Sequence, residues 1–341
     1  MKILIHFQPA NSDYLFEGAR LRKTLKGACE SVGVTWVDAF SGAPDIAHFI
    51  SAEDVKLLEK AKERGIKSVV SAGYTEADQK ARYYDYPIGG SPILKKKAKR
   101  IIEEADLTLV PDEITKKRFL EGGVKGNFLV LPAAVNIARF EGASPAEKNI
   151  FKRYARVKDD DRYVLSSAHL DDKETVDIYK KIAALRPEYR FFVLIGRPKS
   201  WLSRMKVASD QRKAPKNLVF GPLIEDDVYR SALLNASCYL KIGSHYSGEI
   251  QILEAFAAKT PVIAYGEQEN SPLLKDGINS EFATTPKEAA DILVELWKGE
   301  DKDMVNEAFR TAKANSLPNF GKKLKQIYED LLNSKEETQH A

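Results

Sequence analysis

The segment SHYSGEIQILEAFAAKTPVIAYGEQENSPLLKDGIN, from Ser244 to Asn279, has the clearest pattern of secondary structure in the chain. It follows a strand-like run that ends near Ile242, and a Ser-Gly turn then opens a helix-like segment, Glu249 to Lys259. A second β-rich run, Pro261 to Tyr265, comes next. A strand, a helix and another strand in this order are typical of a parallel sheet whose faces are covered by helices.

The same alternation of short β-rich runs and helix-like segments extends over nearly the whole chain. It breaks at Ala138 to Ile150, where Gly, Ser, Pro and Asn interrupt the apolar periodicity. We therefore expect an α/β protein with two doubly wound, Rossmann-like domains, at residues 1–145 and 146–315. Residues 316–341 are expected to form a C-terminal helix that packs back on the first domain, and a tail. Domains of this kind bind ligands at the carboxyl ends of their strands, so a cleft between them is the expected site.

The composition excludes several classes of protein. The 341 residues are 43% hydrophobic and carry a net charge of +4, which is too small to indicate a nucleic-acid partner. No run approaches the roughly 18 to 20 apolar residues of a membrane span, and the N-terminal MKILIHFQP lacks the features of a signal peptide, so we expect a cytoplasmic protein. The distant Cys29 and Cys238 indicate neither a disulfide framework nor a cysteine metal site.

Common enzyme motifs are missing. The first strand is followed by QPANSDYLFEGAR, whose single glycine is Gly18, and no G-x-G-x-x-G occurs after any strand, which disfavours a nicotinamide-dependent enzyme. A P-loop, H-E-x-x-H, G-x-S-x-G and paired-cysteine motifs are absent as well. The pattern therefore predicts no metal site and no bound cofactor.

The turn at Ser247 and Gly248 has the composition of a phosphate-binding turn. A small residue lets a ligand approach the backbone, and the free N–H groups at a helix N-terminus attract a diphosphate. Glu254, about a turn and a half into the helix, is placed to accept hydrogen bonds from a ribose diol. A tight turn before a capped helix, with no ligand, explains the same residues structurally.

Several motifs together resemble the retaining GT-B glycosyltransferases, and in particular the bacterial diacylglycerol glycolipid glycosyltransferases. LEAFAAKTPVIAY (253–265) followed by LLKDGIN (273–279) is similar to the signature of the family's second domain. DIAHF (45–49) resembles a family strand that ends in histidine, and LPAAVNIARF (131–140) resembles the crossover between domains. TEAD (75–78) and ADLTLVPDEITKKRFLEGGV (105–124) resemble further first-domain segments. The resemblance implies a GT-B fold and a UDP-sugar donor.

The resemblance also assigns roles to single residues. Glu254 matches the family's ribose-binding glutamate, and Lys173 matches the lysine that neutralises the donor diphosphate, although it is equally well explained as a solvated residue at a helix start. Gly18 matches the place where main chain approaches the diphosphate, and His48 matches the histidine at the end of its strand. We therefore expect His48 to be catalytic and Glu254, Lys173 and Gly18 to bind the donor, together with Ser247 and Gly248.

The sequence departs from the family at two places near the expected sugar. Tyr246 stands where the family has a second glutamate, and Glu249 is the nearest carboxylate; it either replaces that glutamate as a catalytic residue or caps the helix. The related glycolipid enzymes have histidines in the loop where this chain has Ser71, Ala72 and Gly73. Loss of a histidine there removes an expected contact with the sugar or the acceptor.

The segment SPILKKKAKR (91–100) concentrates positive charge on an expected first-domain helix. Apolar residues, among them Ile101 and Ile102, alternate with the cations. A basic amphipathic surface of this kind is held at an anionic bilayer by about 1 kcal/mol per cation, although a solvated helix face has the same pattern. The expected membrane-binding residues are Lys95, Lys96, Lys97, Lys99 and Arg100.

These observations combine into one functional expectation. We expect a retaining, metal-independent glycosyltransferase that moves a hexose from a UDP-sugar to an acceptor, with a membrane glycolipid such as monoglycosyl-diacylglycerol as the favoured one. The protein would lie in the cytoplasm, peripheral to the inner face of the cell membrane. The alternative, motivated by Tyr246 and Gly73, is a non-catalytic GT-B relative that acts as a binding partner or regulatory subunit of another glycosyltransferase.

Overall fold

The computed structural model describes residues 1–7, 15–50, 55–74, 84–85, 93–94, 96–168, 173–195, 201–242, 249–266, 273–298 and 302–334. The chain divides into two compact units. The first takes Met1–Val135, Ser247–Ile250 and Asn315–Ala341, and the second takes Asn136–Tyr246 and Gln251–Ala314. Each unit contains a six-stranded sheet with helices, so the predicted α/β class with two doubly wound sheets is confirmed.

All strand pairs of the first sheet are parallel. The burial of all five residues of the third strand along the chain, IAHFI, is typical of a parallel sheet covered on both faces. In spatial order the strands are β2 (Thr35–Val37), β1 (Lys2–His6), β3 (Ile46–Ile50), β4 (Lys67–Ser71), β7 (Leu107–Val110) and β8 (Phe128–Val130).

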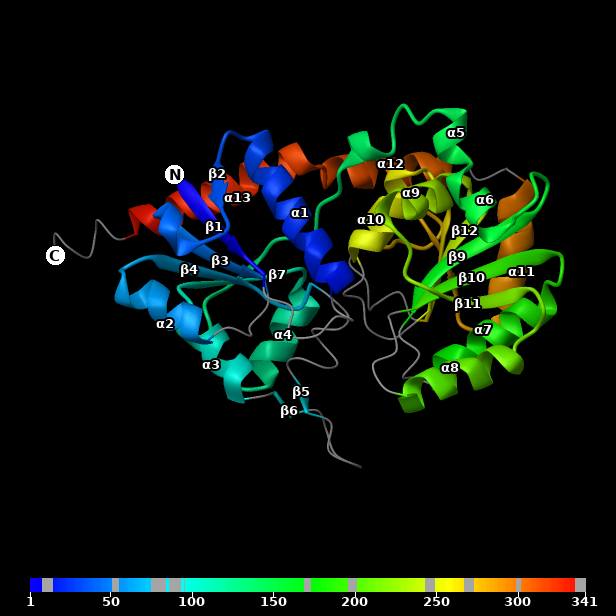
Figure 1. Ribbon diagram of the computed structural model, residues 1–341, viewed down its shortest axis with the longest axis horizontal. Coiled ribbons are helices and arrows are strands. Elements are labelled where there is room, and N and C mark those ends of the chain that lie inside the picture. The colour runs from blue at the N-terminus through cyan, green and yellow to red at the C-terminus, as the bar shows by residue number, and fades with distance from the viewer. Residues whose placement is uncertain are drawn as a thin grey trace. The chain divides into compact units, whose positions relative to one another are not determined.

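Helices cover both faces of the first sheet. Asp112 caps one of them, because its Oδ1 accepts a hydrogen bond from the Thr115 backbone N–H at 2.6 Å. The helices are α1 (Leu15–Ser31), α2 (Val55–Glu63), α3 (Lys96–Glu104), α4 (Glu113–Glu121) and α13 (Leu317–Asn333), with a short 3₁₀ turn, η2 (Phe40–Gly42). Figure 1 shows α1 and α13 on one side of the sheet and α2 and α3 on the other.

The C-terminal helix α13 packs on α1 within the first unit. The two helices approach closely at Gly321, where an added Cβ would lie 2.5 Å from the carbonyl oxygen of Ala28. Ser31 Oγ also donates a hydrogen bond to the carbonyl of Leu317 at 3.4 Å. The last helix of the chain is therefore part of the unit that contains the first strand.

The second sheet is also parallel throughout. In spatial order its strands are β11 (Leu218–Pro222), β10 (Tyr189–Ile195), β9 (Arg162–Ala168), β12 (Cys238–Ile242), β13 (Val262–Tyr265) and β14 (Glu281–Ala283). The helices that accompany it are α5 (Pro145–Lys148), α6 (Ile150–Ala155), α7 (Lys173–Leu185), α8 (Trp201–Arg212), α9 (Asp226–Asn235), α10 (Glu249–Ala257), α11 (Pro286–Lys298) and α12 (Lys302–Ala314), with the 3₁₀ turn η4 (Ile137–Arg139).

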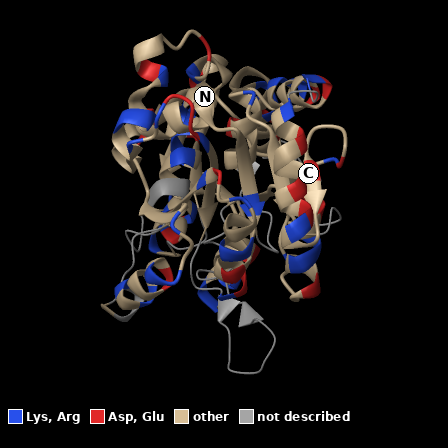
Figure 2. Cartoon of the chain, turned by 90° about the vertical axis from the view of Figure 1, so that its right-hand side faces the viewer, with Lys and Arg blue, Asp and Glu red and all other residues tan. Residues whose placement is uncertain are grey.

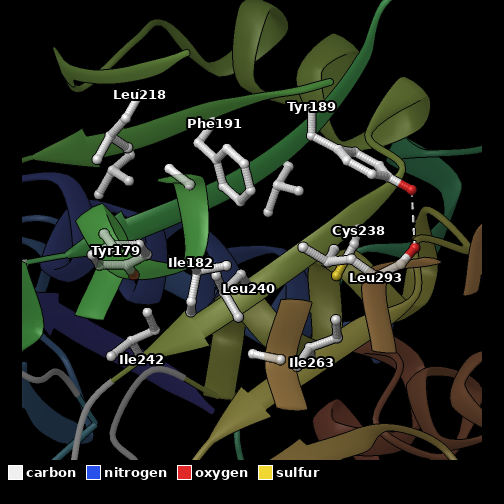
Figure 3. Packing of buried hydrophobic residues seen from close by; sticks show 14 of the residues in the cluster. Tyr179, Ile182, Tyr189, Phe191, Leu218, Cys238, Leu240, Ile242, Ile263 and Leu293 are labelled. Atoms are coloured by element: carbon white, nitrogen blue, oxygen red, sulfur yellow. Dashed lines mark hydrogen bonds between the residues drawn. The ribbon is translucent and has the colours of Figure 1, made fainter. Parts of the chain in front are cut away.

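The core of the second unit lies between its sheet and helices α7 and α11 (Figure 3). The buried hydroxyl of Tyr189 donates to the carbonyl of Leu293 at 3.0 Å, so the aromatic ring is buried without leaving its polar end unsatisfied. Cys238 belongs to the same cluster, and burial raises the pKa of its thiol. Burial raises the pKa of Cys29 to about 12, so both cysteines act as small apolar residues.

The structure differs from the expected elements in three places. The basic helix expected in the segment 91–100 begins only at Lys96, because Ile93–Leu94 form the strand β6, which pairs with β5 (Tyr84–Asp85). The segment expected to be irregular holds α5, whose start is fixed by a capping box between Ser144 and Glu147. Helices α8 and α12 were not predicted.

Candidate functional site

The best-defined candidate site residue is Glu254, on α10 of the second unit. This helix is buried on all sides, since every residue from Ile250 to Ala257 is buried. Glu254 is also only 5% exposed. A carboxylate at such a position is stable as an anion only when charged or hydrogen-bonding groups compensate for its lost hydration.

Arg139, at the end of η4, supplies this compensation. Its Nη1 donates to Glu254 Oε1 at 2.9 Å, and its Nη2 donates to both the carbonyl oxygen and Oδ1 of Asp226 at 2.7 Å. The Arg139 side chain is 15% exposed and that of Glu254 7%, so the ion pair lies largely out of solvent. The planar guanidinium holds one oxygen of Glu254 in a fixed direction.

Sequence reasoning assigned no role to Arg139. The signal that could have found it is its place in LPAAVNIARF, the segment that resembles the family's crossover. A second signal was Glu254 itself, because a glutamate flanked by apolar residues on every side of a helix, as in ILEAFAA (252–258), requires a cationic or hydrogen-bonding partner.

A second buried polar cluster fixes the first turn of α10. Ser167 Oγ and the hydroxyl of Tyr239 contact Gln251 Oε1 at 2.5 Å and 3.0 Å, and the two hydroxyls are 2.7 Å apart. Ser167 lies near the carboxyl end of β9 and Tyr239 lies in β12. These contacts tie the start of the helix that carries Glu254 to the carboxyl end of a sheet strand, where ligands of such folds bind.

The other expected donor-binding residues of the second unit are described in part. Lys173 is the first residue of α7, and its side chain is exposed. Glu249 is the first residue of α10, but its side chain lies outside the described residues, as do Ser247, Gly248 and Tyr246. The roles expected for these residues stay predictions.

Gly18 lies in α1 and is buried. The ring of Phe7 occupies the space where a Cβ at this position would lie. Packing of Phe7 therefore explains why a residue without a side chain stands here, and the contact with a donor diphosphate stays a prediction.

The structure corrects the catalytic role expected for His48. The side chain lies in β3 with 0% exposure. Its Nδ1 is hydrogen bonded to the hydroxyl of Tyr328 at 2.6 Å and its Nε2 to Ser71 Oγ at 2.8 Å. Burial lowers the pKa of His48 from its ordinary value of 6.5 to about 3, so the ring stays neutral. Both ring nitrogens are occupied, and His48 links β3, β4 and α13 instead of contacting a substrate.

Gly73 shows why this chain lacks a histidine at that place. Its φ is +80°, in the left-handed region that favours glycine, and an added Cβ would lie 2.6 Å from Thr115 Cγ2. A larger residue would therefore have to move both the backbone and the start of α4. The backbone conformation at Gly73 and the nearby Thr115 side chain thus account for the absence of a histidine at this position.

The basic helix α3 also differs from the expected membrane surface. Its apolar residues Ile101 and Ile102 are buried in the core of the first unit, so they do not face outward as an amphipathic membrane helix requires. Arg100 pairs with Glu104 at 2.6 Å and with Glu59 at 2.8 Å, and Lys99 lies 3.7 Å from Glu103. Lys96 and Lys97 are exposed at the start of the helix, and Lys95 lies outside the described residues.

None of the helices in the described part of the chain is long and apolar enough to cross a membrane. Over the same residues, no three His, Cys, Asp or Glu side chains form a group that could hold a metal ion. Metal independence stays a prediction.

The two six-stranded parallel sheets, each with its helices, define the GT-B fold of glycosyltransferases, as the resemblance implied. The structure of Anabaena HepE in complex with UDP and glucose matches with a TM-score of 0.68 and 13% identity, over 97% of this chain and 100% of that one. A glycosyltransferase from Rickettsia africae matches with the same TM-score and identity, over 97% and 98% of the two chains.

Comparison of the sequence with known proteins finds similarity to enzymes of glycolipid synthesis. The chain is 21% identical to the processive diacylglycerol alpha-glucosyltransferase of Acholeplasma laidlawii, over 98% of this chain and 100% of that protein. It is 21% identical to the alpha-monoglucosyldiacylglycerol synthase of Streptococcus pneumoniae, over 68% of this chain and 53% of the relative. No protein-family model matches the chain. The resemblance to diacylglycerol glycolipid glycosyltransferases is therefore confirmed, as a similarity that spans the full length of one of them.

Proposed function

We propose that this protein is a retaining, metal-independent hexosyltransferase that transfers a sugar from a UDP-sugar to a membrane glycolipid, with monoglycosyl-diacylglycerol as the favoured acceptor. The observation that carries the proposal is the full-length correspondence with the Acholeplasma laidlawii glucosyltransferase, which includes both units. The reaction would take place at the inner face of the cell membrane, where a glycolipid acceptor presents its head group.

In the proposed donor site, Glu254 accepts hydrogen bonds from the ribose hydroxyls of UDP. The contact with Arg139 supports this role, because it holds one oxygen of the carboxylate in a fixed direction before the donor arrives. Lys173 and the N-terminus of α10, at Gly248, bind the diphosphate. The exposed lysine at the start of α7 has the charge and the reach that such a contact requires.

The proposed chemistry is a displacement on one face of the sugar. The bond between the anomeric carbon and the UDP oxygen breaks, and the acceptor hydroxyl oxygen forms a bond to that carbon from the same face. The proton of the hydroxyl passes to an oxygen of the departing diphosphate. Cations and backbone N–H groups stabilise the charge that develops on the diphosphate, so no protein nucleophile is required.

Two considerations support retention. The names of both glycolipid relatives specify an alpha-linked glucosyl product. The sugar of UDP-glucose is itself alpha-linked, so an alpha product keeps the anomeric configuration.

Glu249, the first residue of α10, is proposed to position the donor sugar. It would take the role of the family's second glutamate, because this chain has Tyr246 at that glutamate's position.

The donor site is tested by calorimetric titration of UDP into the full chain. Glu254→Ala is expected to weaken binding by about 1.5 to 3 kcal/mol, the scale for lost charge-assisted hydrogen bonds. Glu295→Ala is the matched control, because Glu295 is an exposed glutamate on α11 of the same unit. Equal UDP affinity of Glu254→Ala and the parent would overturn the donor-site assignment.

The reaction is tested with UDP-glucose and monoglucosyl-diacylglycerol in mixed micelles, with NMR assignment of the new anomeric bond and a parallel assay in EDTA. Glu249→Gln is expected to preserve UDP affinity and lower turnover about 100-fold, through lost positioning. UDP binding without sugar transfer to any lipid acceptor would contradict the enzyme assignment. A beta product, or loss of activity in EDTA, would contradict retention or metal independence respectively.

A further inference from the structure

Helix α8 of the second unit presents an unusual outward face. Trp201 is 68% exposed and Met205, one turn later, is 51% exposed. Ala208 and Arg212 continue the same stripe at helical spacing, and both are exposed as well. Large apolar side chains with this degree of exposure, aligned on one helix face, mark an interaction surface more often than isolated ones do.

The opposite face of α8 anchors the helix to its own unit. Val207 packs against the core cluster. Asp210 pairs with Lys180 of α7 at 2.8 Å. The Gln211 side chain donates to the carbonyl of Leu218 and accepts from the N–H of Phe220, both at 2.8 Å. The orientation of the helix is thus fixed, and Trp201 and Met205 point away from these contacts.

The surroundings of the exposed stripe are strongly basic. Residues 201–216 contain five cations and a single acid, Asp210, which is held in its ion pair on the opposite face. Over most of the remaining chain, apart from the basic segment 91–100, basic and acidic side chains are interspersed, and the net charge is only +4 (Figure 2). The five cations, all exposed, are Arg204, Lys206, Arg212, Lys213 and Lys216.

We propose that the outward face of α8 docks on an anionic lipid bilayer, with Trp201 and Met205 in the head-group layer and Arg204 and Arg212 beside lipid phosphates. Tryptophan prefers the interface between water and hydrocarbon, and a helix that joins such a ring to cations is suited to lie in that plane. Positive charge around the apolar stripe complements the negative surface of the bilayer.

A comparison with α3 supports this choice of surface. Both helices are rich in cations, but Ile101 and Ile102 of α3 are buried in the core, whereas the apolar residues of α8 face outward. Electrostatic attraction alone is reversible and is screened by salt, and stable association requires apolar contact as well. Among the described residues, α8 presents cations and exposed apolar side chains on the same helix face.

The first test uses the fluorescence of Trp201 alone. In a full chain with Trp36→Phe and Trp297→Phe, addition of phosphatidylglycerol vesicles is expected to shift the emission of Trp201 to shorter wavelength, and brominated acyl chains are expected to quench it. The reciprocal variant, Trp201→Phe with Trp297 retained, is the matched control. Trp297 is also 50% exposed, but the guanidinium of Arg162 lies over its ring. Unchanged Trp201 emission, or equal quenching of Trp297, would overturn the proposal.

The second test is co-sedimentation with the same vesicles. Trp201→Ser with Met205→Ser is expected to lower the partition coefficient about tenfold. Arg204→Gln with Arg212→Gln is expected to lower it about tenfold or more, and this effect should vanish in vesicles of neutral lipid. Lys322→Gln with Lys323→Gln removes the same charge from exposed positions on α13 and should have little effect.

The outcomes distinguish docking through α8 from the proposed reaction and from lipid contact through α3. Vesicle binding is measured without UDP-sugar, so it does not depend on the proposed reaction. If Lys96→Gln with Lys97→Gln abolishes sedimentation while both α8 variants bind as the parent does, lipid contact belongs to α3 and the α8 proposal is wrong. The α8 proposal is also wrong if the parent protein does not sediment with anionic vesicles at all.

Discussion

Each unit of this protein buries a polar network, and the two networks differ in charge. In the first unit His48 joins Ser71 and Tyr328 through neutral hydrogen bonds. In the second unit Arg139 and Glu254 form an ion pair. Burial keeps the imidazole neutral, whereas in the second network the guanidinium lies beside the buried carboxylate and compensates for its lost hydration. The first network can therefore only hold elements together, while the second also fixes the direction of a charged hydrogen-bond acceptor.

Removing Tyr328 should give the largest effect. Tyr328→Ala leaves a cavity beneath α13 and deprives His48 of one partner, so we expect the first unit to lose about 3 to 5 kcal/mol of unfolding free energy. Urea unfolding followed by Trp36, which lies in β2, reports on this unit once Trp201 and Trp297 are replaced by Phe. Tyr328→Phe separates the hydrogen bond from the cavity and should lose about 1 to 2 kcal/mol. If Tyr328→Ala lowers the unfolding free energy by less than about 1 kcal/mol, the network around His48 does not stabilise the first unit.

The ion pair should respond differently, because its members are charged. Arg139→Met leaves Glu254 buried without this cation, and we expect the second unit to lose about 3 kcal/mol. Adding Glu254→Gln should recover at least about 1 kcal/mol, since the uncompensated charge is then removed. Unfolding followed by Trp201 and Trp297 in a Trp36→Phe background measures both changes. If the double variant is less stable than Arg139→Met alone, the pair is not held by charge compensation.

The neutral network predicts a pH dependence of the first unit. The pKa of His48 is about 3 in the folded chain and about 6.5 when it is unfolded, so between these values only the unfolded chain takes up the proton. Stability contributed by neutral His48 is therefore lost as the pH falls, by about 2 kcal/mol between pH 7 and pH 5. The Tyr328 hydroxyl does not titrate in this range, because burial raises its pKa. Urea midpoints for the parent and His48→Gln provide the measurement, and equal slopes against pH would contradict this assignment.

Ser71→Ala should give the smallest effect. It removes the partner of His48 Nε2 but leaves nearly the same volume filled, so we expect a loss of about 1 kcal/mol in the first unit. The Trp36 reporter and urea unfolding apply again. Ser31→Ala is a suitable comparison, because its hydroxyl is part-buried and bonds to the carbonyl of Ala28 at 2.7 Å, within the same unit. A loss for Ser71→Ala no larger than that for Ser31→Ala would mean that the histidine contact contributes nothing particular.

The fold could be predicted from the sequence wherever apolar spacing marks a buried face. Helix α7 (Lys173–Leu185) is an example, because Val176, Tyr179 and Ile182 follow one another at helical spacing and are buried. Helix α8 was missed because its inward contacts are mostly polar, through Asp210 and Gln211, and its largest apolar residues face outward. A pattern that locates buried faces cannot detect such a helix.

The candidate site was harder to predict than the fold. Glu254 was singled out from its neighbours in the sequence, but its partner Arg139 is 115 positions away, and no local pattern connects them. His48 was interpreted as catalytic because its motif, DIAHF (45–49), resembles a family strand that ends in histidine. Its burial depends on Tyr328, 280 positions later, which covers it from another helix.

The position of α13 in the first unit also determines the order in which the two units can finish folding during synthesis. Residues 1–135 leave the ribosome long before Leu317–Asn333, yet the first unit requires this helix to cover α1 and to bond to His48. All residues of the second unit lie between Asn136 and Ala314, so this unit can fold before α13 is synthesised. The unit that is made first is therefore completed last, and until then the nascent chain exposes an unfinished apolar surface that a chaperone could bind.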